Sequence, residues 1–88
     1  MPVEVLVLER FHIRAPPIAD EMRVSVVVKD TDPPYSPERP WYSEPFDLHI
    51  PYAEYSPERE RAELERMVRE YLRMRRPELL EAIGWPPE

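Results

Sequence analysis

The chain has 88 residues, enough for one small domain with a limited hydrophobic core. It has no cysteine, which excludes disulfides, thiolate metal sites and cysteine nucleophiles. The formal net charge is −6, of which residues 1–55 carry −5 and residues 56–88 carry −1. Because phosphate backbones attract clustered positive charge, nucleic-acid binding by the isolated chain is disfavoured.

The polar composition indicates a thermophilic source. Eleven arginines accompany a single lysine, fourteen glutamates accompany four aspartates, and asparagine and glutamine are absent. Scarce amides, many ion-pairing residues and proline-rich connections recur in thermophile proteins. No basic segment followed by an apolar run opens the chain, and no apolar stretch approaches membrane-spanning length. We therefore expect a soluble, cytoplasmic protein of a thermophilic bacterium, without a membrane partner.

Two runs rich in β-branched residues predict the first two strands, at about 3–14 and 22–29. They are expected to form an antiparallel hairpin, because consecutive prolines at 16–17 must lie in the connection. Alternation along the first run places five apolar residues on one face: Val3, Val5, Val7, Phe11 and Ile13. Leu6, Leu8 and His12 fall on the other face. Apolar residues on both faces indicate that both faces of part of this strand are buried. A subunit interface could bury the second face.

Residues 30–45 form an unusually long, proline-rich connection. Prolines restrict the unfolded chain and therefore favour an ordered loop. The segment concentrates four large or charged side chains, Tyr35, Arg39, Trp41 and Tyr42. They either cover the edge of the sheet or form a presented binding loop, because rigid aromatic side chains are favoured contact residues. These four are the candidate protein-binding residues.

Residues 46–52 alternate regularly and predict a third strand, which lies at an edge because prolines flank or interrupt it. Asp47 and His49 project from its polar face, and we expect His12 and Arg23 of the neighbouring strands beside them. A carboxylate can orient an imidazole for metal binding or for acid–base catalysis. A solvated polar face is the simpler interpretation, since no ligand spacing such as HExxH is present.

The strongest periodic pattern predicts a helix over about 57–75. Ser56 is a favourable N-cap, Pro57 fits the first helical position, and Pro77 ends the helix. Apolar residues recur every three or four positions and predict a buried stripe of Leu64, Met67, Val68, Tyr71, Leu72 and Met74. A second, short helix is expected at about 78–83, closed by Gly84 as a C-terminal cap.

These elements predict an α+β fold in a single domain over 1–88. It consists of a three-stranded antiparallel sheet, a long amphipathic helix and a short C-terminal helix. Open sheet edges and apolar residues on both faces favour a homodimer. We interpret the chain as a small non-catalytic protein-interaction or regulatory module that needs no cofactor or metal and binds a protein partner or itself.

Two other classes of function stay open. The element order is similar in outline to the sheet-and-helix domain of HicB-type antitoxins, although no motif of that family is present residue by residue. This resemblance implies an antitoxin-like regulatory protein that contacts nucleic acid as a dimer or together with a partner. The third interpretation is a small metal-dependent enzyme that uses His12, Asp47 and His49.

Overall fold

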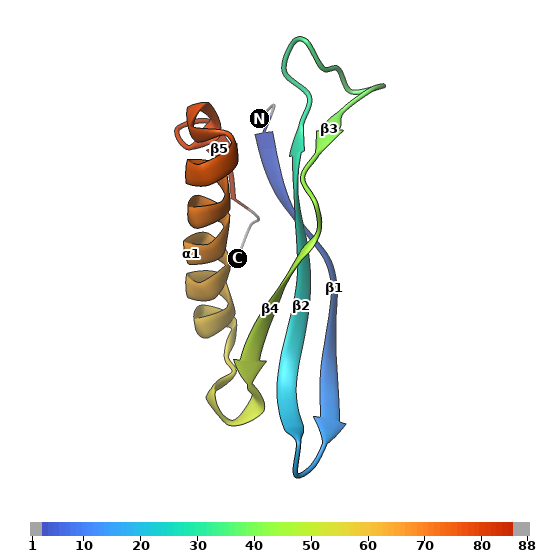
Figure 1. The fold of residues 1–88 in the computed structure, drawn as a ribbon, viewed down its shortest axis with the longest axis vertical. Coiled ribbons are helices and arrows are strands. Elements are labelled where there is room, and N and C mark those ends of the chain that lie inside the picture. Colours follow the sequence, from blue (N-terminus) through green and yellow to red (C-terminus); the bar gives the residue numbers. More distant parts are fainter. Residues whose placement is uncertain (1–2, 86–88) are drawn as a thin grey trace.

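The fold is α+β, with a mixed sheet and one main helix across one of its faces (Figure 1). The computed structural model describes residues 3–85. Strands β1 (Val3–Ala15) and β2 (Ala19–Asp30) form a long antiparallel hairpin. Strand β4 (Phe46–Pro51) pairs antiparallel with the first half of β2. The helix α1 spans Pro57–Arg75.

Two further strands contain only two residues each. Strand β3 (Trp41–Tyr42) pairs with the end of β2, and β5 (Ile83–Gly84) pairs parallel with the start of β1. The prediction of three antiparallel strands is therefore correct only for β1, β2 and β4, since the sheet has five strands and is mixed. Two-residue strands contain too few residues to show alternation, which explains why the sequence did not reveal them.

The predicted second helix is also wrong in part. A single 3₁₀ turn (Pro77–Leu79, η2) follows α1, and the chain then enters β5. Gly84 pairs with Glu4 inside the sheet, and no described glycine has a positive φ. Gly84 is therefore not the left-handed cap of a helix. A second 3₁₀ turn, η1 (Tyr52–Glu54), connects β4 to α1.

The start of α1 follows from local chemistry. The hydroxyl Oγ of Ser56 accepts a hydrogen bond from the Arg59 amide at 3.0 Å, which satisfies one of the free amides of the first turn. Leu64, Val68 and Leu72 recur every four residues and are buried. The predicted stripe is wrong at Met74, whose side chain is 83% exposed, because two residues after Leu72 the helix surface has turned to the opposite side.

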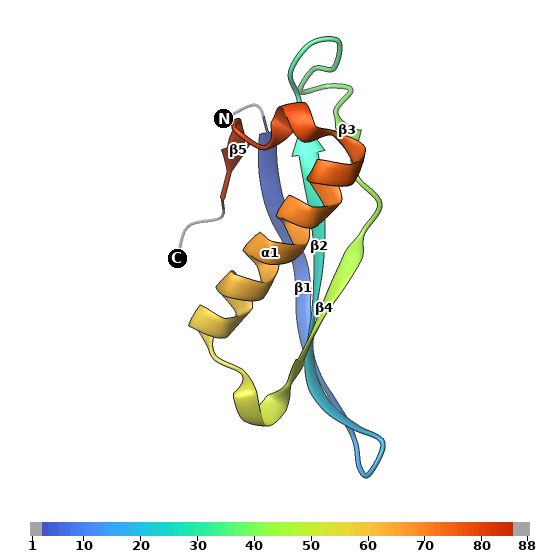
Figure 2. The same ribbon diagram turned by 60° about the vertical axis from the view of Figure 1, so that its left-hand side comes forward.

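The core lies between α1 and one face of the sheet. Valines from β1 and β2 form most of its sheet side, together with Leu48 of β4. Its sheet residues are Val3, Val5, Val24, Val26, Val28, Leu48 and Ile83. Phe46 and Tyr71 stack across the helix–sheet boundary with ring centroids 5.5 Å apart. The helix crosses this face diagonally, and the β1–β2 hairpin extends past it into solvent (Figure 2).

A β-bulge in β1 reverses the faces of the hairpin beyond it. Val7 pairs with Val26, but the next pair is Glu9 with Ser25, so Leu8 is the extra residue. Arg10 then lies opposite Val24 and His12 opposite Met22, on the face that α1 covers. Phe11 and Ile13 consequently lie on the other face, pairing with Arg23 and Glu21. The predicted alternation of β1 is therefore wrong after Val7.

The bulge also explains the ion pair between the hairpin and the start of α1. Arg10 Nε and Nη2 donate to the two carboxylate oxygens of Glu60 at 2.7 and 2.9 Å. The Tyr55 hydroxyl donates to the same carboxylate at 2.9 Å. Burial alone would raise the pKa of Glu60, but the hydrogen bonds from Arg10 and Tyr55 outweigh it and lower the pKa. Burial and the bond to Glu60 raise the pKa of Tyr55.

Candidate interaction surface

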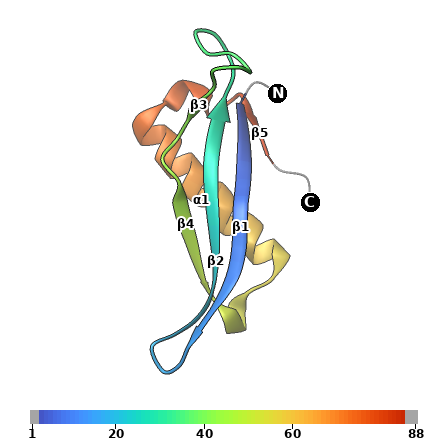
Figure 3. The same cartoon turned by 90° about the vertical axis from the view of Figure 1, so that its right-hand side faces the viewer.

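The face of the sheet opposite α1 has no described element across it, and we call it the open face (Figure 3). Strand pairing decides which side chains belong to it, because alternate residues point to opposite faces. Its members are Glu4, Leu6, Leu8, Glu9, Phe11 and Ile13 of β1, Glu21, Arg23, Ser25, Val27 and Lys29 of β2, Tyr42 of β3, and Asp47 and His49 of β4.

The open face brings three of the four predicted cluster residues together. Arg23 pairs with His49 across the β2–β4 ladder, and Asp47 is paired with the neighbouring Ser25. The Ser25 hydroxyl donates to Asp47 Oδ1 at 2.5 Å. His49 Nδ1 lies 2.6 Å from Glu21 Oε2, and Arg23 Nη2 lies 3.8 Å from the same oxygen. A carboxylate therefore does orient the His49 imidazole, but it belongs to Glu21.

Glu21 was missed because the predicted second strand began at residue 22, whereas β2 begins at Ala19. Extending the alternation by one residue places Glu21 on the face of Arg23. The Nε atom of Arg23 is buried and has no hydrogen-bond partner among the described residues. Buried polar atoms without a partner are rare, so this nitrogen is an exception within the cluster.

His12 does not join this cluster. The bulge places it on the face that α1 covers, where its ring stacks on Tyr52 with centroids 3.9 Å apart and planes 8° apart. Its Nε2 lies 2.5 Å from Asp20 Oδ1. The predicted set of His12, Asp47 and His49 is therefore split between the two faces. Within residues 3–85, no group of three or more His, Cys, Asp or Glu side chains is placed to hold a metal ion.

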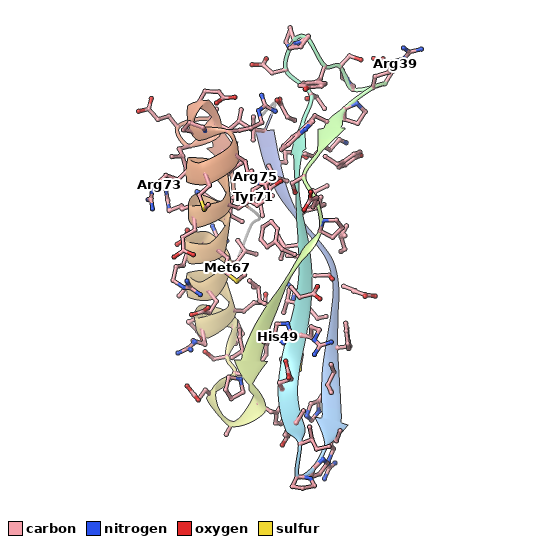
Figure 4. The ribbon with its side chains drawn as sticks, viewed as in Figure 1. Arg39, His49, Met67, Tyr71, Arg73 and Arg75 are labelled. Carbon is pink, nitrogen blue, oxygen red and sulfur yellow. The ribbon has the colours of Figure 1, made fainter. Side chains whose placement is uncertain are left out.

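The proline-rich loop uses two of its four candidate residues inside the fold. The Arg76 guanidinium lies 4.7 Å from the Trp41 ring centroid and 5.7 Å from that of Tyr35. Such cation–π contacts hold the loop against the end of α1. Arg39 is exposed at the tip of the loop and projects away from the body of the protein (Figure 4). Tyr42 lies on the open face and is 52% exposed.

Large apolar side chains are exposed on the open face. Leu8 is 56% exposed and Phe11 is 39% exposed, and Tyr42 lies at the far end of the same face. Sequence reasoning placed Phe11 on the same face as Val3, Val5 and Val7 because it did not detect the bulge. The signal that pointed to this surface was the presence of apolar residues on both faces of the first strand. With the bulge included, Leu6, Leu8, Phe11 and Ile13 lie on the open face, while Val3, Val5 and Val7 lie on the face that α1 covers.

The free edges of the sheet are less suited to contact than its face. Beyond its pairing with β5, the outer edge of β1 carries the bulge and the charged residues Glu9, Arg10 and Arg14. Pro45 precedes β4, and Pro51 ends it. Bulges, charges and prolines are the means by which proteins prevent edge-to-edge pairing. The open face has no comparable protection.

The outer surface of α1 carries ion pairs along the first part of the helix. Arg66 donates to Glu63 at 2.9 Å and to Glu70 at 3.1 Å, and Arg61 lies 3.4 Å from Glu65. Arg73 points away from the sheet (Figure 4). Pairs at these spacings stabilise an exposed helix by about 0.2–0.5 kcal/mol each. Arg59, Arg61 and Arg66 thus form a solvated, ion-paired surface along the first part of α1. The guanidinium groups of Arg69 and Arg75 lie instead over the rings of Trp85 and Tyr71.

Comparison of the chain with models of known protein families, with characterised proteins and with solved structures finds no match. The class of protein is therefore defined here only by its fold, a small α+β domain with one covered and one open sheet face. Among the described residues, no helix is long and apolar enough to cross a membrane.

Proposed function

We propose that this chain is a non-catalytic protein-interaction module and that the open face is its contact surface. The observation that supports this most directly is the exposure of Leu8, Phe11 and Tyr42 on one face of the sheet. Exposed apolar side chains that share a surface and are surrounded by polar residues are typical of protein–protein contact sites. Aromatic residues are also enriched in the centre of such sites.

The surroundings of these side chains fit the same role. Glu21, Arg23 and His49 form a polar group beside the apolar residues, as in the rim of an interface. The long β1–β2 hairpin gives the surface a rigid support, because the two strands pair along their whole length. The predicted loop contact is retained only for Arg39 and Tyr42, since Tyr35 and Trp41 surround Arg76.

A site-specific crosslinking experiment tests the proposal. A photoreactive amino acid at Tyr42, on the open face, is compared with one at Arg73, on the outer side of α1. We expect adducts with a defined protein from position 42 and not from position 73. The adduct must disappear in Leu8→Ser and persist in the matched surface variant Met74→Ser. Adducts that Leu8→Ser leaves unchanged would show that the open face is not the contact surface.

A further inference from the structure

We propose that the open face binds a protein segment that is basic as well as apolar. This inference rests on the proposed function and specifies the chemistry of the partner. The partner would place arginine or lysine against Glu9 and Asp47, while its apolar side chains cover Leu8 and Phe11. The carboxylates of this face indicate the charge of the partner, which neither the fold class nor the exposed apolar residues imply.

Glu9 of β1, Ser25 of β2 and Asp47 of β4 form one row across these three strands. Ser25 is neutral, and its hydroxyl donates to Asp47. Within residues 3–85, no arginine, lysine or histidine forms an ion pair with Glu9 or Asp47. The row is therefore a strip of negative charge that forms no ion pair among the described residues.

The rest of the open face does not neutralise this row. Its strand residues include four carboxylates, at Glu4, Glu9, Glu21 and Asp47, against the two cations Arg23 and Lys29. The formal net charge of the face is thus −2. Arg23 lies beside Glu21, and Lys29 is paired across the strands with Glu4. A partner with positive charge complements this surface, and an acidic partner is repelled.

The carboxylates and the apolar side chains are close enough to contact the same segment. The bulge places Leu8 and Glu9 together opposite Ser25, and Phe11 lies opposite Arg23 in the next row. Lysine and arginine carry a charged group on an apolar stem, so one such side chain can cover an apolar residue and reach a carboxylate. An alternating basic and apolar segment therefore fits both features.

Charge also distinguishes this partner from a second copy of the chain. Two open faces placed against each other would bring two surfaces of net charge −2 into contact, within a chain of net charge −6. Like charges across an interface oppose association and suppress such partners. The predicted homodimer stays a prediction, and the like charge of the two faces disfavours its formation through the open face.

Selection from a random peptide library against the full chain tests the inference. We expect enriched peptides to combine arginine or lysine with apolar residues, and their binding to weaken as salt is raised. The double variant Glu9→Gln with Asp47→Asn should weaken the Kd of an enriched peptide by about tenfold, since two exposed ion pairs are lost. Glu70→Gln on the outer surface of α1 is the matched control and should leave the Kd unchanged.

The outcomes separate the two proposals. Enriched peptides that are apolar but not basic, and that Leu8→Ser abolishes, would overturn the basic partner and keep the interaction surface. An absence of peptides that depend on Leu8 or Phe11 would overturn both proposals. Light scattering provides the third outcome: a dimer that Leu8→Ser converts to a monomer would identify a second copy as the occupant.

Discussion

Arg76 and Asp30 join the end of α1 to the end of β2, with Nη1 and Oδ2 2.9 Å apart. Asp30 is 1% exposed, and its other carboxylate oxygen accepts a hydrogen bond from the Asp32 amide. Burial by itself would lower the pKa of Arg76, but its hydrogen bonds to Glu78 and Asp30 raise it. One guanidinium thus connects helix, sheet and loop, since it also contacts the Trp41 ring.

Replacing Arg76 should therefore destabilise the fold strongly. In Arg76→Ala the buried Asp30 carboxylate loses its counter-charge, and the loss of one member of a buried pair costs about 3–5 kcal/mol. We expect a reduction near the lower limit, because Arg76 itself is partly exposed. Urea denaturation followed by circular dichroism measures the free energy of unfolding. Arg73→Ala, an exposed neighbour, should change it by less than about 0.5 kcal/mol. Equal losses in the two variants would contradict this role.

Glu60 should make the free energy of unfolding depend on pH. Its pKa is lower in the folded protein than in the unfolded chain, so its contribution is complete above the unfolded value of about 4.3. The contribution falls as the pH decreases below that value and is lost once the folded protein also binds the proton. Glu60→Gln should therefore reduce the difference in stability between pH 6 and pH 3, roughly the limits of this titration. Glu38→Gln, in the exposed loop, should leave the difference unchanged.

Ser56 should contribute about 1 kcal/mol through its cap, as N-cap hydroxyls commonly do. The chain contains its own control, because Tyr-Ser-Pro-Glu-Arg occurs at 35–39 and again at 55–59. In the first copy the Ser36 hydroxyl accepts from the Arg39 amide at 3.1 Å, but no helix follows. We expect Ser56→Ala to lower both the unfolding midpoint and the helical signal in circular dichroism. Ser36→Ala should have the smaller effect, and the reverse order would be inconsistent with helix capping at Ser56.

Exchange of a buried helix residue tests the orientation of α1. Leu72→Ala should lower the free energy of unfolding by about 2–5 kcal/mol, the usual loss for a buried leucine. Met74→Ala should have little effect, because that side chain is exposed. The comparison is made by chemical denaturation of the two variants. A larger loss in Met74→Ala would mean that another side of α1 faces the sheet.

The parts of the fold that depend on local chemistry could be predicted from the sequence. The cap at Ser56 and the proline at position 57 set the start of α1, and α1 begins there. The alternation of residues 46–50 places Leu48 and Ile50 inside, where both are fully buried. The first half of β1 follows the same rule, with Val3 and Val5 in the core.

The remaining features depend on contacts between distant segments. No local pattern marks Leu8 as a bulge, because its neighbours form an uninterrupted strand. The pairing of β5 with β1 depends on where the chain returns after α1. The cluster around His49 also depends on such contacts. It was predicted to include His12, which the bulge moves to the other face, and to lack Glu21, which lies beside His49. Its position on the sheet was right for the residues of β2 and β4, whose strands contain no bulge between them.

The bulge at Leu8 has a consequence for natural variation of this chain. Loss of a single codon there would join Val7 directly to Glu9. Because these two residues already lie opposite the consecutive residues Val26 and Ser25, every later side chain of β1 would keep its face. A regular ladder that kept Leu8 would instead turn the later side chains over, moving Phe11 and Ile13 to the face that α1 covers and Arg10 and Arg14 to the open face. Sequences descended from this one should therefore tolerate deletion of residue 8 more readily than insertion of a further residue into β1.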